Sequence, residues 1–136
     1  MLPRLYSNGI RIDFAYVDST KVFDILMMDL YYLIKMLKRG GMVILDDVDY
    51  PGIWLIARFL VTHPSIKFLK GFNKIDVTMK QRVLGWFQHI LFIKKLHYDS
   101  IYTNKLVDEK LGINYKCIAF KKNAEDKRNW NWFKSF

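Results

Sequence analysis

The sequence lacks the features that mark most specialised classes of protein. It contains a single cysteine, Cys117, so an internal disulfide is excluded. No apolar run reaches the roughly 18 residues that a membrane-spanning helix needs, and no signal peptide is recognisable at Met1. We therefore expect a cytoplasmic protein without a transmembrane segment. Such a protein could contact a membrane only at its surface.

Acidic residues are scarce relative to basic ones. Lys and Arg number 22 against 13 Asp and Glu, which gives a formal net charge of +9 and favours anionic partners. Because no recognisable nucleic-acid-binding module is present, we do not expect nucleic acid as a partner. His63, His89 and His97 have no spacing that converges on a metal ion, so surface or packing roles are expected for them.

Apolar residues, in contrast, are abundant. Hydrophobic residues make up 51% of the 136 residues and aromatic residues 16%, which is enough for one domain with a real core. No repeat or low-complexity tract appears. We expect a domain over residues 1–122 and a basic, aromatic tail over residues 123–136, partly disordered except where Trp130, Trp132 and Phe133 dock.

One stretch organises the chain, and its pattern predicts two buried parallel strands joined by a helix. The strands are Ile12–Asp18 and Met42–Asp46, and the helix is Val22–Lys38, closed by a break at Gly40-Gly41. Apolar residues occupy both parities of each strand, which predicts helices on both faces of the sheet. A βαβ crossover is the simplest arrangement of this kind.

Carboxylates follow both predicted strands. Asp18 ends the first strand, and Asp46 and Asp47 end the second. In open parallel sheets, ligands bind beyond the carboxyl ends of the strands. If the two strands are neighbours, the three carboxylates converge at a ligand site. Turn formation is the structural alternative for Asp46 and Asp47.

The rest of the pattern predicts an α/β protein of order β-α-β-α-β-α-β, which is half of a doubly wound sheet. A helix begins near Pro51, with Asp49 as a possible cap, and ends at His63-Pro64. The remaining expected elements are a strand over Ser65–Phe72, an inserted amphipathic helix over Met79–Tyr98 and a strand over Asn114–Lys122. Residues Met1–Arg11 show no periodicity long enough for an element.

The residues from Ile12 to Gly52 resemble the second half of class I S-adenosylmethionine-dependent methyltransferases. In that pattern a strand ends in Asp, a helix ends in a glycine-pair turn, here Met36–Gly41, and the next strand ends in an acidic pair. The likeness is to small-molecule O-methyltransferases of the catechol and macrocin types. It runs from about Leu2 to Phe72, with Asn114–Lys122 as the final strand of a Rossmann-like methyltransferase sheet.

The resemblance implies a cofactor, a metal and roles for five residues. Asp18, Asp46 and Asp47 would stand at the three ligand positions of a divalent metal such as Mg²⁺. Lys21 would stand at the catalytic lysine, although the macrocin-type enzymes keep a His there, and solvation is the structural alternative. Asp18, Ser19 and Thr20 would line S-adenosylmethionine. The implied reaction is O-methyl transfer to a small hydroxylated acceptor.

The family's glycine-rich loop and its ribose-binding acid do not occur in this sequence. We therefore expect the C-terminal half of a methyltransferase, truncated and inactive alone, with the N-terminal cofactor-loop half absent. One alternative is a non-catalytic half-domain that forms a homo-oligomer or pairs with a partner supplying the other half. A further alternative is binding to an anionic membrane or nucleic acid through Met79–Tyr98 and the tail.

Overall fold

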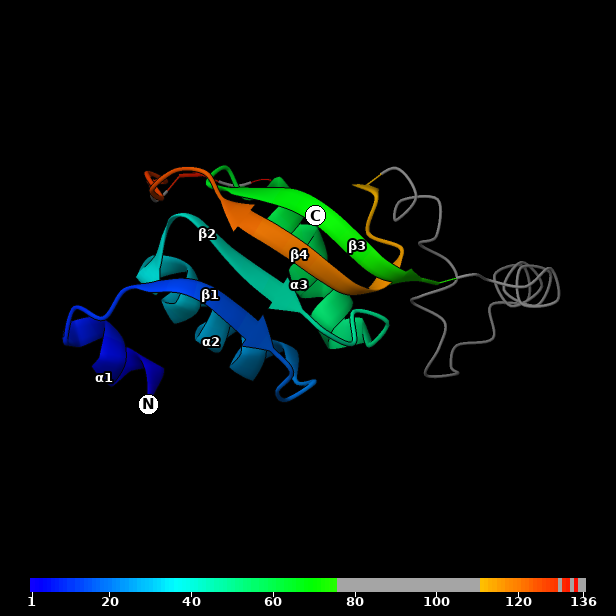
Figure 1. Cartoon of the computed structure of the whole chain (residues 1–136), viewed down its shortest axis with the longest axis horizontal. Helices are drawn as coiled ribbons and strands as arrows, with labels where there is room; N and C mark the ends of the chain where they lie inside the picture. The colour runs from blue at the N-terminus through cyan, green and yellow to red at the C-terminus, as the bar shows by residue number, and fades with distance from the viewer. Residues whose placement is uncertain (76–110, 130, 133, 135–136) are drawn as a thin grey trace, which may run out of the picture.

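A computed structural model of the chain describes residues 1–75, 111–129, 131, 132 and 134 (Figure 1). The elements in chain order are α1 (Leu2–Ser7), β1 (Ile12–Val17), α2 (Phe23–Met36), β2 (Leu37–Leu45), α3 (Pro51–Thr62), β3 (Ile66–Lys74) and β4 (Tyr115–Lys122). The predicted inserted helix over Met79–Tyr98 lies outside the described residues. Across the part of the chain that is described, no helix has the length and apolar character to cross a membrane.

The strands form one mixed sheet of four, in the order β1-β2-β4-β3. β1 and β2 run parallel, with Phe14 beside Met42 and Val17 beside Leu45. β4 lies antiparallel to both of its neighbours, so the last strand in the sequence enters between β2 and β3. The predicted βαβ crossover and the α/β class are therefore confirmed, with α2 as the crossover helix.

The core lies between the sheet and two helices. α2 and α3 pack on the same face of the sheet, behind the strands in Figure 1. This packing buries side chains of all four strands and both helices at 7% exposure or less: Val17, Leu26, Leu30, Val43, Leu45, Ile53, Trp54, Ile56, Ala57, Leu60, Ile66, Ile118 and Phe120. Burial of apolar surface on this scale is the main force that holds the layers together.

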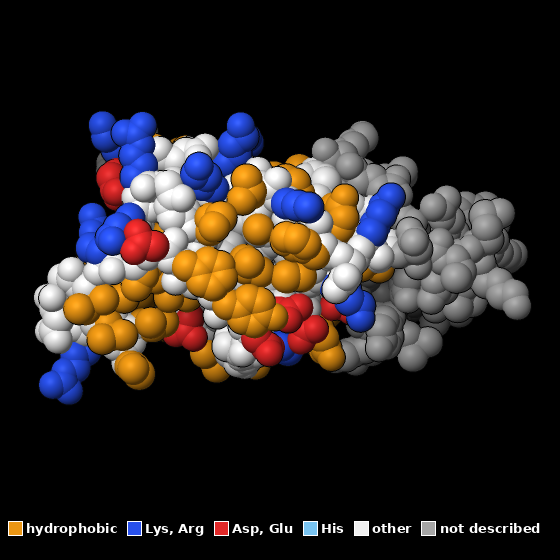
Figure 2. Space-filling model, viewed as in Figure 1, with side chains coloured by type: hydrophobic (Ala, Val, Ile, Leu, Met, Phe, Trp, Pro, Cys, Tyr) orange, Lys and Arg blue, Asp and Glu red, His pale blue; other side chains and the backbone are white. Residues whose placement is uncertain are grey.

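The opposite face of the sheet carries no helix among the described residues, so the helices expected on that face are not seen in this part of the chain. Phe14 and Tyr16 of β1 are 51% and 55% exposed, and Met42 of β2 lies beside Phe14. Figure 2 shows the resulting apolar cluster in the middle of this face. The apolar residues at alternate positions of these strands therefore line two faces, one buried in the core and one exposed.

Local departures from the predicted boundaries occur at turns. Gly40-Gly41 lies inside β2, and Gly40 adopts a positive φ of 89°. A Cβ at Gly41 would lie 2.9 Å from the Asp13 carbonyl oxygen, so β1 and β2 approach closely at this point. The pairing register shifts there, between Ile12 and Phe14. The glycine pair therefore makes an irregularity in a strand rather than a break before one.

Three further expectations need correction. α1 forms where no element was expected, because a six-residue helix is too short to show a periodic pattern. The ring of Tyr6 in α1 lies 5.9 Å from the ring of Tyr32 in α2. Asp49 does not cap α3, whose N-cap is Tyr50, although Pro51 does begin that helix. β3 continues beyond Gly71 to Lys74.

The tail leaves β4 and packs back on the helices. The Lys122 ammonium, on a side chain that is 1% exposed, donates to the carbonyl oxygens of Ile34 at 3.1 Å and Leu37 at 2.8 Å. It also pairs with Glu125 at 2.9 Å. Lys122 thus satisfies carbonyls at the C-terminus of α2 that have no partner within the helix. The Trp132 ring lies 6.3 Å from the His63 ring, which agrees with the docking expected for Trp132, whereas Trp130 and Phe133 lie outside the described residues.

Candidate functional site

The carboxyl ends of β1 and β2 hold a cluster of charged side chains. Asp18 follows β1, Lys21 stands in the loop before α2, and Asp47 follows β2. The Lys21 Nζ atom lies 3.1 Å from Asp18 Oδ1 and 2.7 Å from Asp47 Oδ2. The structure therefore joins the ends of two parallel strands through one lysine, at the edge where α/β proteins bind ligands.

Backbone hydrogen bonds fix the two acidic residues after β2. The Asp46 N–H donates to the Val17 carbonyl at 3.1 Å, which extends the strand pairing by one residue. Asp47 then adopts a positive φ of 54°, a conformation that Asp tolerates better than most residues. Its N–H donates to Asp46 Oδ1 at 2.8 Å, and its carbonyl accepts from Tyr50 N–H at 3.0 Å. This turn directs Asp47 toward Lys21.

Gly52 lets α3 pack closely against the loop between β1 and α2 that carries Lys21, here called the lysine loop. A Cβ at Gly52 would lie 2.5 Å from the Lys21 carbonyl oxygen and 3.3 Å from the Phe23 nitrogen, which are backbone atoms of the loop and of α2. Only glycine allows the first turn of α3 to pack this closely on the loop. The position of Lys21 therefore depends on a glycine in a different element.

The charge of Lys21 is stabilised by its partners. The hydrogen bond to Asp47 is the main cause that raises the pKa of Lys21. Burial opposes it, and the hydrogen bond to Asp18 raises the pKa further. Lys21 is therefore a cation throughout the neutral range. The Tyr50 ring lies 5.7 Å from its ammonium, so an aromatic face adjoins the charge. The side chain of Lys21 remains 32% exposed, so a ligand can reach it.

Tyr16 and Asp46 form a second pair beside the first. The Tyr16 hydroxyl donates to Asp46 Oδ2 in a short hydrogen bond. This bond raises the pKa of Tyr16 to about 12 and lowers the pKa of Asp46. Sequence reasoning missed both Tyr16 and Tyr50. The available signal was strand alternation, because Tyr16 precedes buried Val17 and must face the other side of the sheet.

The three carboxylates are not arranged as a metal site. Within residues 1–75 and 111–134, wherever the structure describes them, no three His, Cys, Asp or Glu side chains are placed to hold a metal ion. The Lys21 ammonium lies between Asp18 and Asp47, and the Tyr16 hydroxyl occupies an oxygen of Asp46. This arrangement does not fit the Mg²⁺ ion that the resemblance implies, because a cationic side chain already balances the carboxylates.

The residues expected to line S-adenosylmethionine lie together at the same edge. Ser19 is exposed, whereas Thr20 Oγ1 accepts the Val22 N–H at 3.3 Å and so serves the local turn. Asp18 is held by Lys21 but keeps 56% of its side chain exposed. These residues fit one side of a polar cofactor. A glycine-rich loop after a strand does not occur among the described residues.

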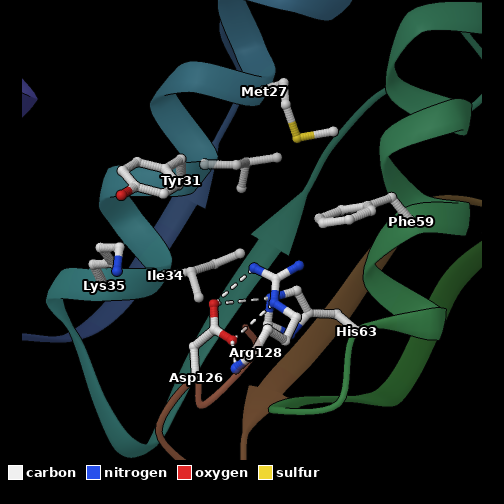
Figure 3. A pocket seen from close by; sticks show the side chains of 9 residues that line it. Met27, Tyr31, Ile34, Lys35, Phe59, His63, Asp126 and Arg128 are labelled. Carbon is white, nitrogen blue, oxygen red and sulfur yellow. Dashed lines mark hydrogen bonds and ion pairs between the residues drawn. The ribbon is translucent and has the colours of Figure 1, made fainter. Parts of the chain in front are cut away.

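A second concave site lies at the other end of the helices. A pocket of about 100 Å³ opens between α2, α3 and the tail, and Figure 3 shows Asp126 and Arg128 of the tail closing one side of it. Arg128 donates to Asp126 at 2.8 and 2.7 Å. The lining is Met27, Leu30, Tyr31, Ile34, Lys35, Phe59, His63, Asp126 and Arg128. The tail therefore packs in a groove lined mainly by apolar residues, and within the tail Asp126 and Arg128 pair with each other.

His63 in this pocket has a structural role. Its Nδ1 atom lies 3.3 Å from the Ser65 N–H and 3.0 Å from the Ser65 hydroxyl, so Nδ1 accepts and the ring proton lies on Nε2. Nε2 lies 3.7 Å from Asp126 Oδ2. Ser65 is 2% exposed, so this Ser-His-Asp group presents no nucleophile to a substrate. His63 is 2% exposed, which agrees with the packing role expected for it, and burial lowers its pKa to about 4.

Comparison with models of protein families found none that matches this chain, and comparison with curated proteins found no match either. The assignment of function therefore rests on the geometry of the chain's own residues.

Proposed function

We propose that this chain is the C-terminal half of an S-adenosylmethionine-dependent methyltransferase domain that acts on a small hydroxylated acceptor in the cytoplasm. The observation that carries the proposal is the Asp18–Lys21–Asp47 cluster at the carboxyl ends of two parallel strands. The family resemblance pointed to these positions in the sequence, and the consecutive parallel strands β1 and β2 bring them together.

The sheet order supports the same proposal. The sheet is compatible with an α/β domain of this kind, because β1 and β2 form a parallel pair joined by α2 and β4 lies antiparallel beside β2. The cofactor-binding half would then continue the sheet beyond β1. In that arrangement Asp18 and Ser19 face the junction, where they can contact the cofactor from one side.

The chemistry of the cluster fits stabilisation of an acceptor oxygen. S-adenosylmethionine, when bound, supplies a methyl group on a sulfonium sulfur. Lys21 is protonated at neutral pH, so we assign it a hydrogen bond to the acceptor oxygen and stabilisation of its negative charge rather than proton removal. The acceptor proton passes to the exposed Asp18 carboxylate beside Lys21. The Tyr50 ring offers an apolar surface to an aromatic acceptor.

Acceptor binding is one part of this function, and it tests the role assigned to Lys21. Ligand-observed NMR with catechol as the probe should detect binding to the wild-type chain and a loss of at least about tenfold in affinity in Lys21→Met, which one charge-assisted hydrogen bond accounts for. Lys38→Met is the matched control, because Lys38 forms a comparable 2.9 Å pair with Asp13 at the opposite end of the strands. Equal binding by all three proteins would contradict the proposal.

The alternative of a non-catalytic half-domain is favoured by a separate observation, the exposed apolar residues along β1. The alternative of membrane or nucleic-acid binding stays a prediction for Met79–Tyr98, a segment outside the described residues. In the tail, Asp126 pairs with Arg128 and Glu125 with Lys122, so two of its acids already neutralise nearby basic groups.

A further inference from the structure

Three lysines gather on the face of the sheet that carries no helix among the described residues, here called the open face. Phe120 of β4 is buried against the helices, so its neighbours Ala119 and Lys121 lie on the open face. Lys67 of β3 pairs with Lys121, and Lys70 pairs with Ala119, so both of these lysines lie on the open face too. Figure 2 shows basic side chains over β3, beside the apolar cluster.

The irregularity in β3 is what puts two of these lysines on the same side. Lys67 and Lys70 are three residues apart, so in a regular strand they would point to opposite faces. The register shift between Phe68 and Lys70 leaves one extra residue, Leu69, without a partner on β4 and returns Lys70 to the face of Lys67. Bulges that redirect a side chain in this way are common beside functional sites.

The three lysines have no acidic partner within the described part of the chain. Lys67 and Lys121 lie directly opposite each other on neighbouring strands, where Cβ atoms are about 5 Å apart and like charges are destabilising. None of the ion pairs among the described residues involves Lys67, Lys70 or Lys121. An anion that bridges these lysines would therefore relieve a repulsion that the fold leaves in place.

Exposed aromatic rings lie on the same face as the lysines. Phe72 of β3 pairs with Cys117 on the open face and is 41% exposed. The Lys70 ammonium lies 5.4 Å from the centre of the Phe72 ring, so a cation adjoins an aromatic surface. Phe14 and Tyr16 of β1 continue this surface across the sheet. The open face therefore combines rings with unpaired cations.

Single-stranded nucleic acid is the anion that uses both features. Its phosphates contact lysines, and its unpaired bases stack on aromatic rings, as they do on the exposed sheets of known single-strand-binding domains. A lipid surface fits less well. Asp46 lies near Cys117 at the Phe72 end of the open face, where burial and the Asp46 charge raise the pKa of the thiol. A carboxylate there opposes insertion into lipid, whereas uncharged bases can occupy this end.

We propose that the open face binds single-stranded nucleic acid, with phosphates on Lys67, Lys70 and Lys121 and a base stacked on Phe72. The site lies on β3 and β4, the two strands farthest from the β1 edge at which the proposed methyltransferase half would join. It is separate from Met79–Tyr98 and from the tail, for which the sequence suggested such binding. This proposal does not depend on the methyltransferase activity.

The test is fluorescence anisotropy of a labelled oligothymidine titrated with the full chain at several salt concentrations. The logarithm of the association constant should fall with the logarithm of the salt concentration with a slope of about −2, since each of three phosphate contacts on a single strand contributes about −0.7. The double variant Lys67→Gln, Lys121→Gln should bind at least about tenfold more weakly at low salt, with a slope of about −0.7. The control Lys35→Gln, Lys127→Gln removes the same charge from α2 and the tail and should retain the wild-type slope.

A second variant tests the stacking. Phe72→Ala should weaken binding at least about fivefold and leave the salt slope unchanged, because a stacked base releases no counterions. Tyr31→Ala should not weaken it, since Tyr31 is 51% exposed on α2, in the other layer. Circular dichroism of each variant checks that it is folded.

Three results would overturn the proposal. The first is no binding of the oligothymidine by the folded chain at low salt. The second is an equal loss of affinity in the two double variants, which would mean that net charge alone drives binding. The third is binding to phosphatidylserine vesicles that requires Lys67 and Lys121 while the oligothymidine does not bind, which would assign the open face to a lipid surface.

Discussion

The Lys122 ammonium lies 2.8 Å from the carbonyl oxygen of Leu37, a residue 85 positions earlier in the chain. Through this contact the last residue of β4 donates a hydrogen bond at the C-terminal end of α2. The side chain is buried, and its charge is balanced by Glu125 at 2.9 Å. β4 therefore stabilises the crossover helix that lies between Lys21 and Asp47 of the candidate site.

Replacement of Lys122 by Met should lower the free energy of unfolding by about 2 to 4 kcal/mol, because two buried carbonyl groups lose their hydrogen-bond donor. Urea denaturation followed by circular dichroism measures this change. Lys121→Met is the control, since its side chain is exposed on the adjacent position of the same strand. Equal effects of the two substitutions would show that the Lys122 contacts do not contribute.

His63 should make stability depend on pH. Its folded pKa of about 4 lies below the ordinary value of 6.5, so the unfolded chain binds a proton more readily between these values. The stabilising effect of the neutral ring is complete above pH 6.5 and is lost as pH falls toward 4. Between pH 7 and 5 the free energy of unfolding should fall by about 2 kcal/mol.

The same unfolding measurement on His63→Gln isolates this effect. The variant keeps a neutral polar side chain, so the slope between pH 7 and 5 should flatten. Asp126 and Asp46 also have lowered pKa values, but they lose their stabilising effect only below the ordinary carboxyl range. An unchanged slope in the variant would assign the pH dependence to other groups.

Much of the architecture was predictable because it depends on local patterns. The βαβ unit, α3 and β4 follow from apolar periodicity, from Pro51 and from His63-Pro64. The exposure of Phe14 and Tyr16 was not predictable, since a strand with apolar residues at both odd and even positions looks the same whether or not its second face is covered.

Side-chain partners were predictable only where the chain itself brings them close. Asp18 and Lys21 are three residues apart, so their pairing is local. Asp47 joins them only because β1 and β2 are neighbours. The bonds of Lys122 to α2 and the contact of Asp126 with His63 join residues far apart in the sequence, which no periodic pattern encodes.

Gly52→Ala should disturb the lysine loop. The added methyl group would lie 2.5 Å from the Lys21 carbonyl oxygen, so backbone must move, at a cost of about 1 to 3 kcal/mol in stability. Thermal denaturation should show a lower midpoint, and catechol binding should weaken with it. Leu55→Ala, an exposed position on the same helix, should change neither property. A wild-type midpoint for Gly52→Ala would mean that the loop adapts freely.

Tyr16 should remain protonated to unusually high pH. Its hydrogen bond to Asp46 raises the pKa to about 12, and Asp46→Asn removes the carboxylate responsible. Titration of ¹³C-labelled tyrosine by NMR should therefore show one late-titrating ring in the wild type that moves toward the ordinary value in the variant. A resonance whose pKa is unaffected by Asp46→Asn would contradict the pairing.

The cofactor side of the candidate site gives the most direct test of the methyltransferase proposal. The measurement is calorimetric titration of the full chain with S-adenosylhomocysteine, with and without Mg²⁺. We predict saturable binding that is lost in Asp18→Asn, retained in the matched Asp13→Asn variant and unchanged by Mg²⁺, because Lys21 already balances the carboxylates. Absence of binding in a folded sample, or binding indifferent to Asp18→Asn, would contradict the account.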